Sequence, residues 1–363
     1  MNILIVTTHL NYGGIASYVL ALAEGLKIRG HEVLVASSGG DLVSRLLMRG
    51  VRHICLDINT KSELSPKIIG AFLRLSLLLR REEIEIIHAQ TRVAQVLSCA
   101  LGAVFSLPCV STCHGYFRPR WGRRMFGCWG KRVIAISNAV FAHLRDDLCV
   151  EQRRIRLVYN GVEPGEERRD ASGDAKIKLG LSSGPVVGII ARLSAVKGHR
   201  YLIEAMKEVL AEEPKAQLLI VGDGKCRLEL LALAGAAGLS DKVLLLPARG
   251  DLDEPFSAID VYVSVSVKEG LGLSVLEAMG HCVPVVAFKV GGICDIIAHE
   301  INGLLVSPRD SHSLAGAILR IIKDKGFAVK LARSGYRAVK EKFSLGRMIE
   351  ATIKTYGEAR NEA

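Results

Sequence analysis

The chain has 363 residues, 49% of them hydrophobic, so it can fill two α/β domains of ordinary size without disulfide or metal support. Its formal net charge of +11 favours an acidic partner: a nucleotide, a phosphorylated lipid, an anionic membrane surface or a nucleic acid. The 9 cysteines are scattered and include no C-x-x-C pair, which argues against a disulfide-stapled secreted domain and for reduced thiols in a cytoplasmic protein.

The N-terminal stretch MNILIVTTHL has no basic region ahead of its apolar residues, so it predicts a first strand rather than a signal peptide. Residues 93–110 carry no charge and approach the minimal length of a transmembrane helix. Gln95, Ser98 and Pro108 interrupt this stretch, so we expect a buried helix followed by a strand, and no integral membrane segment.

Short apolar runs alternate with longer helical patterns through the first half of the chain. Strands are predicted at residues 3–7, 33–37, 53–56, 85–89, 108–113 and 133–137. Helices are predicted at residues 14–29, from 41, at 66–81, from 93 and at 138–148. This alternation is typical of a parallel sheet covered on both faces.

The second half repeats the plan. Strands are predicted at residues 186–190, 218–222, 242–246, 259–265, 284–288 and 303–306. Helices are predicted at residues 198–210, 227–237, near 254, after 272, at 313–323, 327–342 and 344–357. Residues 160–184 are rich in Gly, Pro, Ser and charge and are the expected linker. The fold class is therefore α/β, with two doubly wound parallel sheets whose strands end around a ligand-binding crevice.

The stretch KEGLGLSVLEAMG, residues 268–280, places Glu269 and Glu277 around a strand-to-helix turn. Glu269 is expected in the loop ahead of the helix N-terminus, where unpaired backbone N–H groups favour an anion, and Glu277 within the helix. Gly270 and Gly272 let the backbone approach a polyhydroxylated ligand that carries a phosphate. An ordinary turn with two solvated glutamates fits the spacing alone equally well.

Glycines also follow other predicted strands. Gly13 and Gly14 open the first helix, where backbone N–H groups can face a phosphate or sugar, although the sequence is not the dinucleotide fingerprint G-x-G-x-x-G. Gly222 lies in VGDGKC, which lacks the rest of a P-loop, so a P-loop ATPase is not expected. At each position an ordinary glycine turn is the alternative.

Three charged or polar side chains also follow predicted strands. His114 can exchange a hydrogen bond with a sugar hydroxyl without a full charge at neutral pH, and a packed histidine is the alternative. Cys109 and Cys113 precede it, but no second ligand pair follows, so a metal site is not expected. Arg192 and Lys197, in ARLSAVKG, can together neutralise a diphosphate. Basic residues at a helix start oppose its dipole, so a bound anion is favoured there.

The order of these motifs resembles that of retaining glycosyltransferases of family 4, whose GT-B fold consists of two facing Rossmann-like domains. The resemblance runs almost end to end and is carried by YGG, HG at His114, ISNAV, YNGV, ARLSAVKG, VGDG, EGLGLSVLEAMG with its E-x7-E spacing, PVVAFKVGG and NGLLVSP. It implies an acceptor-side domain at residues 1–165, a donor domain at 166–342, and a C-terminal helix at 343–363 that crosses back to the first domain.

The resemblance also implies a nucleotide-diphosphate-sugar donor. Arg192 and Lys197 would contact the diphosphate, Glu277 the ribose hydroxyls and Glu269 the donor sugar. The remaining donor contacts would come from Gly13, Gly14, Gly222, Gly270, Leu271, Gly272 and Leu273, and from His114 in the other domain. The family pattern often has Phe at the position of Leu271, a conservative departure that leaves the backbone role intact.

Enzymes of this kind proceed on one face of the sugar through an oxocarbenium-like state, and the departing phosphate helps to take the acceptor proton. The resemblance therefore implies no metal ion, no cofactor and no dedicated general base. The two-carboxylate mechanism of glycoside hydrolases does not transfer to Glu269 and Glu277.

The acceptor is suggested by the basic segment, residues 118–132, which begins with Arg118, ends with Arg132 and contains six basic residues and no acidic one. Trp121, Phe126 and Trp129 lie among them, a mixture that suits an anionic membrane surface or a lipid-phosphate acceptor. We therefore expect peripheral attachment to the inner face of a membrane, during assembly of lipopolysaccharide or another surface glycan. A nucleic-acid backbone, or a solvated helix with inward aromatics, is the alternative, and no specific nucleic acid is expected as a partner.

Two other function classes fit the same fold. A GT-B sugar-nucleotide epimerase would turn over the donor without an acceptor, and a non-catalytic nucleotide-sugar binding protein would bind it and transfer nothing. The base, the sugar and the acceptor stay open, because UDP, GDP and ADP donors are all compatible with these motifs.

Overall fold

The computed structural model describes residues 1–60, 62–63, 65–119, 121–165 and 172–361. The chain divides into two compact units. The N-terminal unit contains Met1–Asn160 and Leu345–Ala363, and the C-terminal unit contains Gly161–Ser344. The domain boundaries expected from the sequence lie at 165/166 and 342/343, and the units divide at 160/161 and 344/345. None of the described helices is both long and apolar enough to cross a membrane.

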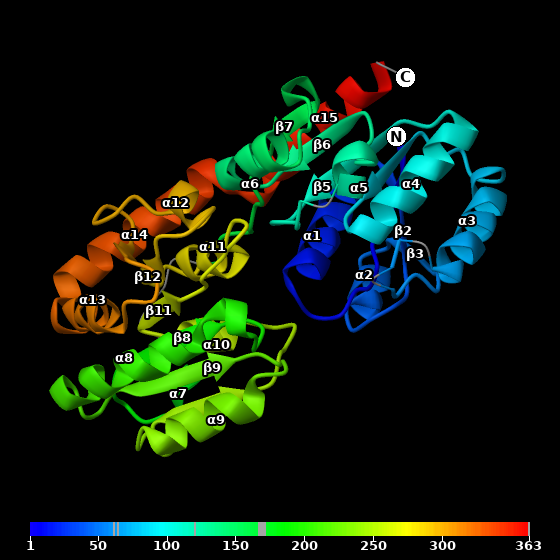
Figure 1. Ribbon diagram of the computed structural model, residues 1–363. Helices are drawn as coiled ribbons and strands as arrows, with labels where there is room; N and C mark the ends of the chain where they lie inside the picture. The colour runs from blue at the N-terminus through cyan, green and yellow to red at the C-terminus, as the bar shows by residue number, and fades with distance from the viewer. Residues whose placement is uncertain (61, 64, 120, 166–171, 362–363) are drawn as a thin grey trace. The chain divides into compact units, whose positions relative to one another are not determined.

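The N-terminal unit is built on a 7-stranded sheet with the order β3-β2-β1-β4-β5-β6-β7 (Figure 1). All neighbouring strands pair in parallel. The strands are β1 Asn2–Val6, β2 Glu32–Ser37, β3 Arg52–Cys55, β4 Ile86–Ala89, β5 Cys109–Cys113, β6 Arg132–Ala135 and β7 Ile155–Leu157. The short β7 was not predicted.

Helices cover both faces of this sheet. They are α1 Gly14–Ile28, α2 Val43–Met48, α3 Pro66–Leu79, α4 Arg92–Phe105, α5 Trp121–Met125, α6 Asn138–Ala142 and α15 Leu345–Asn361, with a π-helix at His143–Asp147 and a 3-10 turn at Gln152–Arg154. Ile3 and Ile5 of β1 pack with α1, α2 and α15, whereas the alternate residues Leu4 and Val6 pack with α3 and α4. This period of two is what a strand buried on both faces requires.

A buried polar network attaches α15 to the N-terminal sheet. The His88 ring, on β4, lies 2.7 Å from the Tyr356 hydroxyl of α15 and 2.7 Å from the Thr112 hydroxyl of β5. Burial lowers the pKa of His88 to about 3, so the ring is neutral. A neutral imidazole can donate from one nitrogen and accept at the other, which satisfies both contacts.

The C-terminal unit is built on a 6-stranded sheet with the order β10-β9-β8-β11-β12-β13. Its strands are β8 Val186–Ile190, β9 Gln217–Val221, β10 Val243–Leu246, β11 Val261–Ser264, β12 Val285–Phe288 and β13 Leu304–Val306. Its helices are α7 Ser172–Lys178, a 3-10 turn at Ala195–Lys197, α8 His199–Glu212, α9 Arg227–Ala236, α10 Asp253–Ala258, α11 Leu273–Gly280, α12 Ile293–Ile296, α13 Ser311–Lys323 and α14 Lys325–Lys342.

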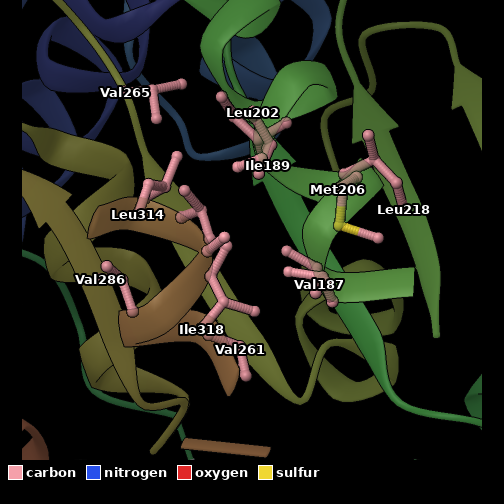
Figure 2. Close-up of a cluster of buried hydrophobic side chains, with 14 of the residues drawn as sticks. Val187, Ile189, Leu202, Met206, Leu218, Val261, Val265, Val286, Leu314 and Ile318 are labelled. Atoms are coloured by element: carbon pink, nitrogen blue, oxygen red, sulfur yellow. The ribbon is translucent and has the colours of Figure 1, made fainter. Parts of the chain in front are cut away.

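The core of this unit lies between its sheet and two helices. Side chains of β8 lie beside Leu202 and Met206 of α8 in Figure 2, and Leu314 and Ile318 of α13 belong to the same buried cluster. Valines of β8, β11 and β12 supply the sheet side of the same cluster, which fixes the strand ends that carry the loops described below.

One sequence expectation was wrong, and another was confirmed with a local difference. The expected linker contains α7, which belongs to the C-terminal unit, and its buried Lys176 forms an ion pair with Asp260 at 2.6 Å. Residues 166–171 of that stretch lie outside the described residues. The helix expected at residues 138–148 is present as α6 followed directly by a π-helix turn, in which the buried His143 ring lies 2.6 Å from the Asp147 carboxylate and accepts from the Phe117 N–H at 3.0 Å.

Candidate active site

Lys197 and Glu269 lie on the two loops at the switch point of the second sheet. β8 and β11 are neighbours, and the chain leaves them in opposite directions, toward β9 and β12. Doubly wound sheets bind ligands at this position. The Lys197 ammonium lies 2.6 Å from a Glu269 carboxylate oxygen, with both side chains partly exposed, 24% and 16%. The Ser266 hydroxyl donates to the same oxygen at 2.8 Å, so two donors orient the carboxylate.

Gly198 holds the Lys197 loop against the loop after β11. Its φ is +68°, and a Cβ there would lie 2.0 Å from the Val265 carbonyl oxygen. The Val267 N–H donates to the Val196 carbonyl oxygen at 2.9 Å, directly beside this contact. The glycine of the KG motif therefore permits the close approach that brings Lys197 to Glu269.

Gly222 and Gly224 pack the loop after β9 onto the loop that carries Arg192. A Cβ at Gly222 would lie 2.1 Å from the Ala191 carbonyl oxygen, and one at Gly224 would lie 2.1 Å from that of Leu193. The close packing of the two loops therefore explains why a glycine is required at position 222, without a ligand. Arg192 itself is exposed, and its guanidinium has no partner in the part of the chain that the structure describes.

A glycine turn opens α11. Gly272 has a φ of +108°, and a Cβ at Gly292 would lie 2.2 Å from the Gly270 carbonyl oxygen. Leu271 is buried, so only its backbone can face a ligand. Leu273 is the first residue of the helix and contributes one of the N–H groups that have no partner within it. The turn thus presents backbone donors beside Glu269.

Glu277 lies one turn inside α11. Its side chain is half-buried, and among the described residues no hydrogen bond or ion pair reaches its carboxylate. Loss of hydration raises the pKa of Glu277 to about 7. The buried Tyr262 lies close by, but its hydroxyl donates to the Ile190 carbonyl oxygen at 3.2 Å. A carboxylate with unfilled acceptor capacity suits a ligand that offers hydroxyl groups.

We did not predict a role for His199 from the sequence. It is buried at the start of α8, and both ring nitrogens lack a hydrogen-bond partner within the described ranges. Burial, with the nearby Lys197 ammonium, lowers the pKa of His199 to about 4. The buried Ser194 hydroxyl of the same loop is also unpartnered there. Ser194 begins the SAVKG stretch and His199 directly follows it, and this position was the feature of the sequence that could have pointed to them.

In the N-terminal unit, His114 lies against α1. Its Nε2 is 2.9 Å from the Gln90 side-chain oxygen, and its ring meets the Tyr18 ring edge-on with centroids 4.8 Å apart. Burial lowers the pKa of His114 to about 3, so the ring is neutral, and with Gln90 as acceptor Nε2 carries the proton. Gln90, directly after β4, was not predicted.

Gly13 and Gly14 begin the same helix α1. Gly13 has a φ of +154°, and a Cβ at either glycine would meet no atom within 4 Å. Space beside the helix N-terminus is therefore open in this unit. No group of His, Cys, Asp or Glu side chains able to hold a metal ion occurs among the described residues.

The structure separates the side chains of the basic segment into two groups. Trp129 and Arg132 are buried, so Arg132 was wrongly counted among residues available to a partner. Trp121 and Phe126 are 75% and 68% exposed, so the alternative of inward-packed aromatics holds only for Trp129. Arg120 lies outside the described residues.

Comparison with known proteins identifies the family. The model of Glycosyltransferase Family 4 matches residues 12–166, and that of Glycosyl transferases group 1 matches residues 174–338. An uncharacterised glycosyltransferase of Methanocaldococcus jannaschii is 29% identical over 95% of this chain and 94% of its own length. A UDP-Gal:α-D-GlcNAc-diphosphoundecaprenol α-1,3-galactosyltransferase of Escherichia coli is 28% identical over 71% of this chain and 72% of its own.

Among solved structures, the Anabaena protein HepE in complex with UDP-glucose superposes with a TM-score of 0.88 at 23% identity, over 99% of this chain and all of the other. The two matched models divide the chain between its two sheets, and the fold agrees with that division. The chain therefore belongs to the group 1 glycosyltransferases of family 4 and has their GT-B fold.

Proposed function

We propose that this glycosyltransferase moves a sugar from a nucleotide-diphosphate-sugar to a lipid-linked or glycan acceptor in the assembly of lipopolysaccharide or another surface glycan. Transfer retains the anomeric configuration and uses neither a metal ion nor a cofactor. The observation that carries the donor assignment is the Lys197–Glu269 pair beside the N-terminus of α11, at the sheet's switch point. UDP-glucose bound to the Anabaena protein and the UDP-galactose named for the E. coli relative favour a UDP-sugar.

The diphosphate is assigned to the N-terminus of α11. The backbone N–H groups of residues 270–273 and the helix dipole favour an anion there. Arg192 is exposed and unpaired within the described residues, and Lys197 is close enough to the turn to exchange Glu269 for phosphate oxygens. These two cations would stabilise the charge that develops on the leaving diphosphate, which is the task that many transferases give to a metal ion.

The ribose is assigned to Glu277. Vicinal hydroxyls can donate two hydrogen bonds to one carboxylate, and Glu277 has both oxygens available in the described part of the chain. Its raised pKa indicates a carboxyl that lacks donors in the ligand-free protein. Donor hydrogen bonds favour the ionised form, so binding would lower this pKa again.

The donor sugar is assigned to Glu269 and His114. Glu269 is held by Lys197 and Ser266, which leaves its other oxygen for a sugar hydroxyl. His114 is neutral and offers its second nitrogen as an acceptor for another hydroxyl. Gly13 and Gly14 would supply backbone donors to the phosphate. Neither Glu269 nor His114 is asked to remove the acceptor proton, which passes to the departing phosphate.

A lipid-linked acceptor would be met at a membrane surface with anionic lipids, to which exposed side chains of the N-terminal unit are assigned. Trp121 and Phe126 protrude from the basic segment, and Ile69, Leu73 and Leu77 form an exposed stripe along α3 at a spacing of one helical turn. Cationic residues flank that stripe on the same helix or just after it: Lys67, Arg74, Arg80 and Arg81. Exposed apolar side chains interleaved with cations are typical of interfacial membrane binding.

A thermal-shift screen with UDP-, GDP- and ADP-sugars tests the donor assignment, because a ligand that binds only the native state raises the melting temperature. The stabilising donor is then incubated with undecaprenyl-diphosphate-linked sugar acceptors in EDTA. An α-linked product from an α-linked donor, unchanged by EDTA, supports the proposal. An epimerised nucleotide sugar formed without acceptor, or binding with no turnover on any acceptor, would replace it by one of the two alternative classes.

A further inference from the structure

His281 directly follows α11, the helix to which the diphosphate and the ribose are assigned above. Its ring Nδ1 lies 2.8 Å from the backbone carbonyl oxygen of Glu277, one turn back in the helix. A carbonyl oxygen can only accept, so Nδ1 carries a proton and donates it. The residue whose carboxylate is assigned to the ribose is therefore held, through its own backbone, by a side chain just outside the EGLGLSVLEAMG stretch.

The other side of this ring connects α11 to α10. Nε2 lies 3.0 Å from a carboxylate oxygen of Asp253, the first residue of α10, and the two groups form an ion pair when the ring is protonated. The ring also stacks on Phe256 of the same helix, with the ring centroids 4.7 Å apart and an angle of 24° between the planes. Phe256 is fully buried, so the stack joins the end of α11 to the buried face of α10.

Backbone at Gly165 covers the same end of α11. The Gly165 N–H donates to the Gly280 carbonyl oxygen at 3.0 Å, and a Cβ at Gly165 would lie 3.5 Å from a carbon of the His281 ring. The Tyr336 hydroxyl, on α14, donates to the Gly165 carbonyl oxygen at 3.3 Å. The His281 side chain is only 21% exposed. Contacts on several sides therefore give the ring one defined position.

The two ends of α11 are fixed by different contacts. The glycine turn at Gly272 and Gly292 sets the N-terminal end, and His281 ties down the C-terminal end. The helix has 8 residues, which corresponds to a length of about 12 Å, and Glu277 lies one turn from His281. A tilt of the C-terminal end would therefore displace the Glu277 carboxylate more than the N–H groups of residues 270–273. Loss of His281 should affect the ribose and spare the diphosphate.

We propose that His281 is a positioning residue for the ribose, which holds the Glu277 carboxylate where the vicinal hydroxyls of a nucleotide reach it. This inference rests on the assignment of the ribose to Glu277 under the proposed function. His281 itself is assigned no contact with the donor. Its loss lowers the affinity for the nucleotide through the ribose alone, and leaves kcat at saturating donor unchanged.

Two nucleotides that differ only in the ribose test the proposal. UDP and 2′,3′-dideoxy-UDP are titrated calorimetrically into the wild-type protein, Glu277→Ala and His281→Ala. GDP or ADP and its dideoxy analogue replace them if the donor screen selects that base. Wild type should bind the ribose form more tightly. In His281→Ala the Kd of UDP should rise about 3- to 10-fold, as expected for one or two lost hydrogen bonds, and the Kd of the dideoxy nucleotide should not change.

Three further variants serve as controls. His312→Ala removes a surface histidine that also pairs with a carboxylate, that of Glu208 at 2.7 Å, and should leave both dissociation constants unchanged. His281→Asn places an amide nitrogen close to the position of Nδ1, so it should recover part of the preference for the ribose form. In the Glu277→Ala background, His281→Ala should have no further effect on the binding of UDP.

The outcomes separate this proposal from the assignment on which it rests. If none of the nucleotides binds, or if Glu277→Ala keeps the preference for the ribose form, the ribose assignment is wrong and the role of His281 is lost with it. If Glu277→Ala loses the preference and His281→Ala keeps it, only the role of His281 is wrong. Equal weakening of both nucleotides in His281→Ala would show a general structural role and would also overturn the proposal.

Discussion

The Lys197 ammonium and the Glu269 carboxylate meet at 2.6 Å although 72 residues separate them in the chain. The pairing follows from strand order, because β8 and β11 are neighbours while their loops are far apart in sequence. A partly exposed ion pair contributes only about 0–1 kcal/mol to the free energy of unfolding. Its presence at a sheet's switch point is therefore better explained by ligand binding than by stability.

Removing the Lys197 ammonium should impair transfer much more than folding. In Lys197→Ala the leaving diphosphate loses a cation, so we expect kcat/KM to fall by about 100- to 1,000-fold. The melting temperature should move by less than about 4 °C, because the pair is partly exposed. Lys207→Ala, on the exposed face of α8, is the matched control and should behave as wild type. A near-normal rate of transfer by Lys197→Ala would show that Lys197 is not part of the active site.

Gly198 should be irreplaceable for a steric reason. A Cβ at this position meets the Val265 carbonyl oxygen at 2.0 Å, so Gly198→Ala must push the two loops apart. We expect a loss of about 2–4 kcal/mol in the free energy of unfolding, measured by urea denaturation. Gly238→Ala is the control, because Gly238 has a similar φ of +71° but no atom within 4 Å of a Cβ. Gly238→Ala should lose only the free energy that a left-handed backbone costs a residue with a Cβ, about 1–2 kcal/mol. Equal losses of unfolding free energy in the two variants would show that the loop contact is unimportant.

The alternation of apolar runs predicted both sheets, because each parallel strand is buried on both faces and reads as a continuous apolar stretch. It missed β7 at Ile155–Leu157, which is short and partly exposed, and α7, whose Gly, Ser and charged neighbours resemble a linker. Neither element contains enough apolar residues to show a period.

The candidate site was predictable by residue type but not by contact. The glutamates and cations follow strands and could be placed at one edge of a sheet, yet the Lys197–Glu269 pair depends on strand order. The glycines of the motifs were ambiguous for a different reason. In the sequence, a glycine that lets a ligand approach looks the same as one that lets another backbone segment approach. Gly222 is of the second kind, because it lies against the Ala191 carbonyl oxygen. Gln90 belonged to no motif and His199 was marked only by its place directly after SAVKG, so the fold was needed to reveal their surroundings.

The unpartnered carboxylate of Glu277 should cost stability in the ligand-free protein. Its pKa is about 7 in the folded state and 4.5 in the reference state, so the folded protein binds more protons and loses stability as pH rises from 4.5 to 7. The loss is at most about 3 kcal/mol. Glu277→Gln should therefore melt higher than wild type at pH 8 and equally at pH 5. The control Glu229→Gln, at an exposed position of α9, should show no such difference. A lower melting temperature for Glu277→Gln than for wild type at pH 8 would contradict this interpretation of Glu277.

The same carboxyl should make donor affinity depend on pH. Protonated Glu277 loses acceptor capacity, so if it binds the ribose, affinity should fall by up to about tenfold per pH unit below pH 7. Calorimetry in buffers of different ionisation enthalpy should detect proton release on binding near pH 7. Glu277→Gln should bind the donor more weakly and without this pH dependence. An unchanged pH dependence in that variant would assign the titration to another group.

Membrane attachment, if it uses the surface proposed above, should depend on apolar side chains of the N-terminal unit. Leu73 is 59% exposed on α3 and Trp121 is 75% exposed on α5. Burying such a side chain in the lipid interface contributes about 1.5–3 kcal/mol, so Leu73→Glu or Trp121→Glu should weaken partitioning into phosphatidylglycerol vesicles at least tenfold in a flotation assay. Leu228→Glu, 80% exposed on α9 of the C-terminal unit, is the matched control for an added charge and should float as wild type. If all three variants float as well as wild type, the membrane contact does not use Leu73 or Trp121. If the wild-type protein binds phosphatidylcholine vesicles as strongly as phosphatidylglycerol vesicles, its cationic residues do not contribute to binding.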